Sequence, residues 1–240
     1  MSKEKILDLE ELLLEQLKGK MALVLPQSER QEIVVHALNL LLGQKEGQPF
    51  IGLFPSKNEK GHFAKNFLSY GIIEDLLCDA EVEDIIINGL KPVFIHHAQK
   101  GFITTGRNFV SSRELHLFIQ KLLIFAGRAS YHKIANLELP NLAGRVNIID
   151  APLGPQLTIS KAKMDPLSVI DLIKRGTMSY EAAGQLWLYL EGLSIRPANI
   201  IIAGGPGTGK TTLLNALFSF IPVKDRLVVI EDTLELNTFL

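Results

Sequence analysis

One glycine-rich segment constrains this 240-residue chain more than any other feature. Asn199–Ala203 is a near-continuous apolar run, and Gly204–Thr211 follows it with the pattern G-x-x-x-x-G-K-[ST]. Lys210–Phe220 then places leucines at helical spacing. An apolar run of this kind is typical of a buried parallel strand. The order therefore predicts a strand, a phosphate-binding P-loop and a helix.

The chemistry of such a loop predicts a nucleotide site. Its backbone N–H groups and the start of the next helix point at one anion. Lys210 adds a charge against the β- and γ-phosphates, the Thr211 hydroxyl can ligate Mg²⁺, and Thr212 seats the α-phosphate or caps the helix. The alternative is a glycine-rich turn that holds Lys-Thr by chance, which the flanking strand and helix patterns disfavour. The predicted ATP-binding residues are Gly204, Gly205, Pro206, Gly207, Thr208, Gly209, Lys210, Thr211 and Thr212.

A cluster of acids follows a second apolar run. Arg226–Ile230 is predicted as a strand, and Glu231, Asp232 and Glu235 come directly after it. Acids at the carboxyl end of a parallel strand beside a P-loop lie where Mg²⁺ and the attacking water sit. The alternative is a solvated acidic loop.

The rest of the chain changes from helical to mixed patterning. Two amphipathic helices are predicted at 6–18 and 29–42, a loop or short extended excursion at 43–62, and a short helix at 71–79. Further helices are predicted for Ser111–Ala126, from Pro166 to Gly176, and for 179–191. Strands are predicted at Glu83–Asn88, Pro92–His97, Gly101–Thr105, Leu137–Leu139, Arg145–Ile149 and Gln156–Ser160. The predicted domains are a helical lead (1–70), an α+β domain (71–165), a helical linker (166–197) and an incomplete P-loop domain (198–240).

Composition excludes several classes of protein. Lys and Arg total 25 against 26 Asp and Glu, so the formal charge is −1 and no strong field attracts nucleic acid. The single cysteine, Cys78, cannot form an internal disulfide, which favours a reducing, cytoplasmic setting. No stretch approaches the roughly 18 apolar residues of a membrane helix. We expect a soluble protein that meets a membrane only through its partners.

Several motifs in order resemble one family, the type II/type IV secretion and pilus ATPases, and most of all its CpaF-like tight-adherence branch. Leu213–Leu217 matches that branch's Leu-Leu-Asn-Ala-Leu after the P-loop, and Ile230–Leu236 matches its I-E-D-x-x-E-L box. Upstream, Asp79–Gly89 resembles D-P-E-V-T-E-I-M-V-N-G, and Leu139-Pro140 with Gly144–Asn147 resembles L-P-x-G-x-R-V-N. The resemblance runs from about residue 71 to residue 240.

This resemblance implies an α/β fold, in which an α+β N-terminal domain precedes the start of a RecA-like P-loop domain. It implies a homo-hexameric ATP hydrolase at the cytoplasmic face of the inner membrane, which drives secretion or pilus assembly through inner-membrane platform proteins. Glu235, together with Glu231, would position or activate the attacking water, and Lys210 would add its charge. Thr211 and Asp232 would hold Mg²⁺, and Arg145 would reach the nucleotide from the N-terminal domain.

Two departures from the family pattern matter. Ser160 stands where the family has an arginine, although Lys161 and Lys163 could partly substitute. The sequence also stops before the family's Walker B strand and His box. We therefore expect a piece of a longer protein or a curtailed relative that is inactive or very slow by itself. The alternative function is a non-catalytic, nucleotide-binding assembly or regulatory subunit of the same machinery.

Overall fold

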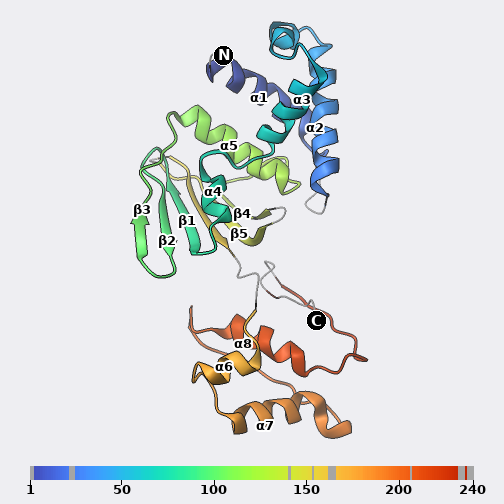
Figure 1. Ribbon diagram of the computed structural model, residues 1–240, viewed down its shortest axis with the longest axis vertical. Coiled ribbons are helices and arrows are strands. Elements are labelled where there is room, and N and C mark those ends of the chain that lie inside the picture. Colours follow the sequence, from blue (N-terminus) through green and yellow to red (C-terminus); the bar gives the residue numbers. More distant parts are fainter. Residues whose placement is uncertain are drawn as a thin grey trace. The chain divides into compact units, whose positions relative to one another are not determined.

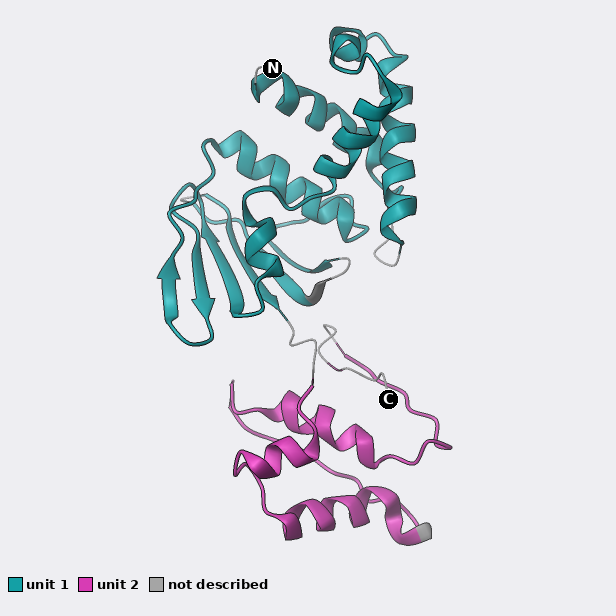
Figure 2. Ribbon diagram, viewed as in Figure 1, with its two compact units in different colours: residues 1–162 teal, residues 163–240 magenta. Residues whose placement is uncertain are grey.

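The chain forms two compact units, Met1–Ala162 and Lys163–Leu240 (Figure 2). The computed structural model describes residues 3–21, 25–139, 142–152, 154–161, 166–205, 207–231 and 236. Within these residues, none of the helices combines the length and the apolar character needed to cross a membrane. The α/β fold class is confirmed, with a helix-and-sheet first unit and a P-loop segment in the second.

An antiparallel sheet organises the first unit. Among the described residues, six strands pair in the order β3-β2-β1-β6-β5-β4 (Figure 1). Every strand predicted between residues 83 and 160 is confirmed, with small shifts of its ends. The observed strands are β1 (Val82–Asn88), β2 (Phe94–His97), β3 (Gly101–Thr104), β4 (Ile134–Leu139), β5 (Leu142–Ile149) and β6 (Gln156–Lys161).

Helix α5 (Ser112–Phe125) lies against one face of this sheet (Figure 1). It begins where predicted, because the Ser111 hydroxyl accepts a hydrogen bond from the Glu114 N–H at 3.2 Å. Glu114 in turn accepts from the Val110 N–H at 2.9 Å, so two free donors at the helix start are satisfied. The predicted apolar stripe is buried against Ile85 and Ile87 of β1 and their neighbours.

The opposite side of α5 supports the N-terminal helices. Leucines of α1 are fully buried in a second core that also contains Leu117, Ile124 and Phe125 of α5. Helix α5 therefore contributes to two cores at once. The elements of this region are α1 (Lys3–Leu17), α2 (Gln27–Leu42), η1 (Gln48–Leu53), α3 (Lys57–Phe67), η2 (Gly71–Ile73) and α4 (Glu74–Cys78).

The prediction of a loop or extended excursion at 43–62 is wrong for most of its length. Gln48–Leu53 forms a 3-10 helix and α3 starts at Lys57. The Ser56 N–H donates to Glu59 Oε2 at 2.9 Å, and the two residues form a capping box. These local hydrogen bonds favour a helix more strongly than the glycines and prolines of this segment favour a loop, and the prediction rested on those glycines and prolines.

The second unit has a small core. Helix α6 (Val169–Lys174) contacts α7 (Tyr180–Glu191) and α8 (Lys210–Leu217), and η3 (Gly192–Ser194) and η4 (Phe218–Phe220) follow α7 and α8. Val169, Leu172, Ala183 and Ala216 form the buried cluster. The predicted helix start at Pro166 is wrong, because Ser168 caps α6 by accepting from the Asp171 N–H at 3.1 Å.

The two parallel strands predicted for this unit are also wrong for the described residues. Neither 199–203 nor 226–230 is assigned as a strand. Ile201 is 92% exposed and Ile230 is 93% exposed. A parallel strand depends on hydrogen bonds from its neighbours and on cover over both faces. The described part of the second unit supplies neither to these runs.

Candidate nucleotide-binding site

The predicted phosphate-binding loop contains two left-handed glycines. Gly207 has φ +71° and Gly209 has φ +84°, a region that side chains with a Cβ rarely adopt. Gly209 forms the N-cap of α8, and the Leu213 N–H donates to the Gly209 carbonyl at 2.9 Å. The chain therefore turns from the loop directly into the helix, as the motif predicts. Pro206, also predicted here, lies outside the described residues.

Two side chains of the loop converge on one backbone carbonyl. Lys210 Nζ donates to Gly205 O at 2.7 Å, and Thr208 Oγ1 donates to the same oxygen at 2.9 Å. A Cβ on Gly204 would lie 2.7 Å from Thr208 Oγ1, so the Thr208 side chain would have to shift to admit one. A phosphate oxygen is a stronger acceptor for an ammonium than a neutral carbonyl, since the bond is charge-assisted. A triphosphate can therefore draw Lys210 away from Gly205.

The first turn of α8 supplies the remaining predicted groups. Lys210, Thr211 and Thr212 are its first three residues, and the first N–H groups of a helix point out of its N-terminal end. This end of the helix dipole favours an anion. Hydroxyl and carboxylate oxygens are ligands that Mg²⁺ prefers, so Thr211 has suitable chemistry for the metal.

The acidic segment is only partly described. Glu231 is half-buried, and one of its carboxylate oxygens accepts from the Leu236 N–H at 2.9 Å. Asp232 and Glu235, the predicted metal ligand and water-positioning residue, lie outside the described residues. Among the residues that the structure describes, no group of three His, Cys, Asp or Glu side chains is placed to hold a metal ion.

Arg145 belongs to the first unit, on strand β5. It is exposed and lies in cross-strand register with Glu138 of β4 and Ser160 of β6. Its predicted approach to the nucleotide stays a prediction. Lys161, offered as a substitute for the missing arginine, donates from Nζ to the Asp79 carbonyl at 2.5 Å. Burial lowers the pKa of Lys161, and its strand neighbour Ser160 points to the opposite face.

Comparison with known proteins finds relatives of this chain among secretion-system proteins. Residues 133–239 match the Type II/IV secretion system protein family. An uncharacterised protein of Methanocaldococcus jannaschii is 39% identical over 175 residues, which are 70% of this chain and 24% of that protein. The protein VirB11 of Rhizobium radiobacter is 28% identical over 201 residues, which are 71% of this chain and 56% of that protein.

Solved structures also resemble the chain. The VirB11 ATPase from the type IV secretion system of Brucella suis, determined in complex with sulphate, matches with a TM-score of 0.39 and 22% sequence identity. The match covers 73% of this chain and 60% of that one. The chain spans about a quarter of the archaeal relative and just over half of VirB11.

Proposed function

We propose that this chain, whose residues 133–239 match the Type II/IV secretion system protein family, is the nucleotide-binding part of a secretion or pilus ATPase. The observation that supports the proposal best is the loop geometry. Left-handed Gly207 and Gly209 lead into the start of α8, and Lys210 is held within 2.7 Å of Gly205 O at the same loop. Such a loop has the donors and the dipole for a nucleotide's phosphates.

The proposed chemistry is attack of water on the γ-phosphate of ATP. Lys210 neutralises the charge that develops on the phosphoryl group. Thr211 and Asp232 would hold Mg²⁺, which would supply further charge neutralisation. Glu235 orients the attacking water, with Glu231 nearby in the sequence. Positioning and charge stabilisation supply most of the acceleration in this class of reaction.

The assembly is proposed at the level of the family. The complete protein would form a homo-hexamer at the cytoplasmic face of the inner membrane, working through platform proteins. Within the family, the proposed position is the tight-adherence branch, because the motifs Leu213–Leu217 and Ile230–Leu236 resemble those of that branch. In this arrangement Arg145 contributes a positive charge to the nucleotide from the first unit. The net charge of −1 disfavours DNA as cargo, because binding to DNA depends on an excess of positive charge.

The first test is nucleotide binding. A fluorescent ATP analogue with Mg²⁺ should bind the 240-residue chain, and Lys210→Ala should weaken this binding at least about tenfold because a charged contact to the phosphates is lost. Lys224→Ala is the matched control, since Lys224 is an exposed lysine of the same unit. Equal affinity of the wild type and Lys210→Ala would refute the nucleotide site.

A second candidate function is a non-catalytic nucleotide-binding subunit of the same machinery. Ser160 favours it, because the family has an arginine there and Lys161 is bonded to Asp79 O. Phosphate release by the complete protein as its cells make it separates the two candidates. Turnover that disappears in Lys210→Ala supports the motor. Tight nucleotide binding without turnover supports the regulatory subunit.

A further inference from the structure

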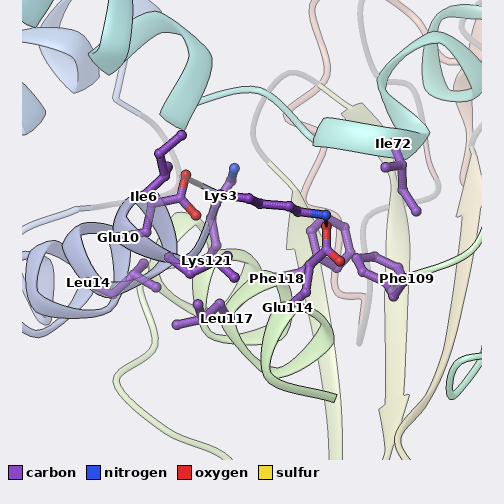
Figure 3. A pocket seen from close by; sticks show the side chains of 11 residues that line it. Lys3, Ile6, Glu10, Leu14, Ile72, Phe109, Glu114, Leu117, Phe118 and Lys121 are labelled. Atoms are coloured by element: carbon purple, nitrogen blue, oxygen red, sulfur yellow. Dashed lines mark ion pairs between the residues drawn. The ribbon is translucent and has the colours of Figure 1, made fainter. Parts of the chain in front are cut away.

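A pocket lies between helices α1 and α5 in the first unit (Figure 3). Its volume is about 270 Å³. Apolar side chains of both helices form most of its wall, and Ile72 and Phe109 complete it. Pockets for drug-sized ligands are usually about 300–1,000 Å³, so this one suits a smaller molecule.

Four charged side chains line this otherwise apolar pocket: Lys3, Glu10, Glu114 and Lys121. Two of these side chains, Lys3 and Glu114, form an ion pair with each other. Lys3 Nζ lies 3.0 Å from Glu114 Oε1, and Glu114 also accepts from the Val110 N–H. The dashed line in Figure 3 marks this ion pair. Glu10 and Lys121 are left as the charged groups available to a ligand.

Lys121 stands in an apolar setting. Its Nζ lies 5.3 Å from the ring centre of Phe67 and 5.9 Å from that of Phe125. Burial lowers its pKa to about 8, although Glu10 and Glu74 oppose this shift. Burial likewise raises the pKa of Glu10, while Lys121 opposes that shift. Among the described residues, neither the Lys121 ammonium nor the Glu10 carboxylate has a hydrogen-bond partner.

We propose that this pocket binds a small zwitterion with an apolar body, of the class of free amino acids with an aliphatic or aromatic side chain. The ligand's carboxylate bonds to Lys121, its ammonium bonds to Glu10, and its side chain covers the apolar wall. Each of the two charges then gains a charge-assisted hydrogen bond, which offsets its desolvation.

Two simpler ligand classes match the pocket less well. A carboxylate with no ammonium would leave Glu10 beside a second negative charge, which is unfavourable. A neutral hydrocarbon would remove water from both charged groups without replacing their hydrogen bonds. A zwitterion satisfies the two groups together. The pocket lies wholly within the first unit, so this inference does not depend on the proposed nucleotide site.

The test is calorimetric titration of the 240-residue chain with L-leucine and L-phenylalanine. At least one should bind with a Kd of about 1 mM or tighter. For leucine, 4-methylpentanoate lacks the ammonium and L-leucinamide lacks the carboxylate, and each should bind at least about tenfold more weakly, as expected for loss of a charged hydrogen bond. The proposal is overturned if neither amino acid binds, or if an analogue binds as well as the amino acid.

Variants locate the site. Lys121→Met and Glu10→Gln should each weaken binding at least about tenfold. Lys65→Met, at an exposed lysine of α3, is the matched control and should bind as the wild type does. Circular dichroism confirms that each variant is folded, and Glu10→Gln keeps the test decisive if Lys121→Met does not fold. Wild-type affinity in a folded Glu10→Gln or Lys121→Met protein would contradict the proposal.

Discussion

At the scale of single residues, Lys121 makes stability depend on pH. Its pKa falls from 10.5 to about 8 in the folded chain, mainly through burial. Between these values the unfolded chain binds more protons than the folded one, so the free energy of unfolding rises as the pH increases. Lys121→Met should be about 1–2 kcal/mol more stable than the wild type at pH 7, with a smaller difference near pH 9.5.

Urea unfolding at pH 7, 8 and 9.5 measures this difference. Lys65→Met is again the control and should follow the wild type at every pH. The buried-amine interpretation would be contradicted if Lys121→Met were less stable than the wild type at pH 7. It would also be contradicted if the difference in the free energy of unfolding between the two proteins were the same at all three pH values. A variant that is more stable yet loses ligand would indicate that Lys121 is kept for binding, since functional groups often reduce stability.

The left-handed glycines of the P-loop give a prediction with an internal comparison. Gly209→Ala places a Cβ at φ +84°, which costs roughly 1–2 kcal/mol. It should lower both the stability of the second unit and the affinity for nucleotide. Gly184→Ala lies inside α7 with open space around it, so it should stabilise by up to about 1 kcal/mol. Equal effects of the two substitutions on stability in urea would contradict this assignment.

At the scale of elements, the start of α5 depends on a single cap. Ser111→Ala removes the acceptor for the Glu114 N–H and should lower the free energy of unfolding by about 1 kcal/mol. Because α5 belongs to both cores of the first unit, the loss should appear in the cooperative unfolding of that whole unit. Ser130→Ala, at an exposed serine of the same unit, serves as the control in the same circular dichroism measurement.

An element could be predicted from the sequence when the interactions that stabilise it lie within the same unit. Strands β4 and β6 alternate between buried apolar residues and more exposed ones, and pairing within the first unit buries the apolar side, so local pattern and structure agree. The runs at 199–203 and 226–230 have equally apolar sequences but depend on neighbours that the described chain does not provide. Helix α3 was missed because its start rests on the Ser56–Glu59 capping box.

The two candidate sites also differ in how far they could be predicted from the sequence. The P-loop could be predicted because its turns, its ammonium and its helix start are consecutive in the sequence. The pocket could not, since Lys3, Glu10 and Lys121 come from helices that are distant along the chain. Glu10 and Lys121 look like ordinary charges on amphipathic helices. Only the packing of α1 on α5 shows that they face the same apolar space (Figure 3).

At the scale of the whole molecule, the two units differ in how much apolar surface they bury. The first has two extensive cores, whereas the buried cluster of the second is small and several of its large apolar side chains are exposed. Since burial of apolar surface is the main stabilising contribution, the second unit should unfold first. Equilibrium unfolding should therefore take two steps rather than one.

The single tryptophan, Trp187 on α7, makes this prediction measurable. Its fluorescence reports on the second unit, while far-ultraviolet circular dichroism is dominated by the helices and sheet of the first. The midpoint in urea should be lower by fluorescence than by circular dichroism. Gly184→Ala should raise only the midpoint measured by fluorescence. Ser111→Ala should lower only the midpoint measured by circular dichroism. Coincident transitions in all three proteins would mean that the units unfold as one, because independent units respond only to changes within themselves.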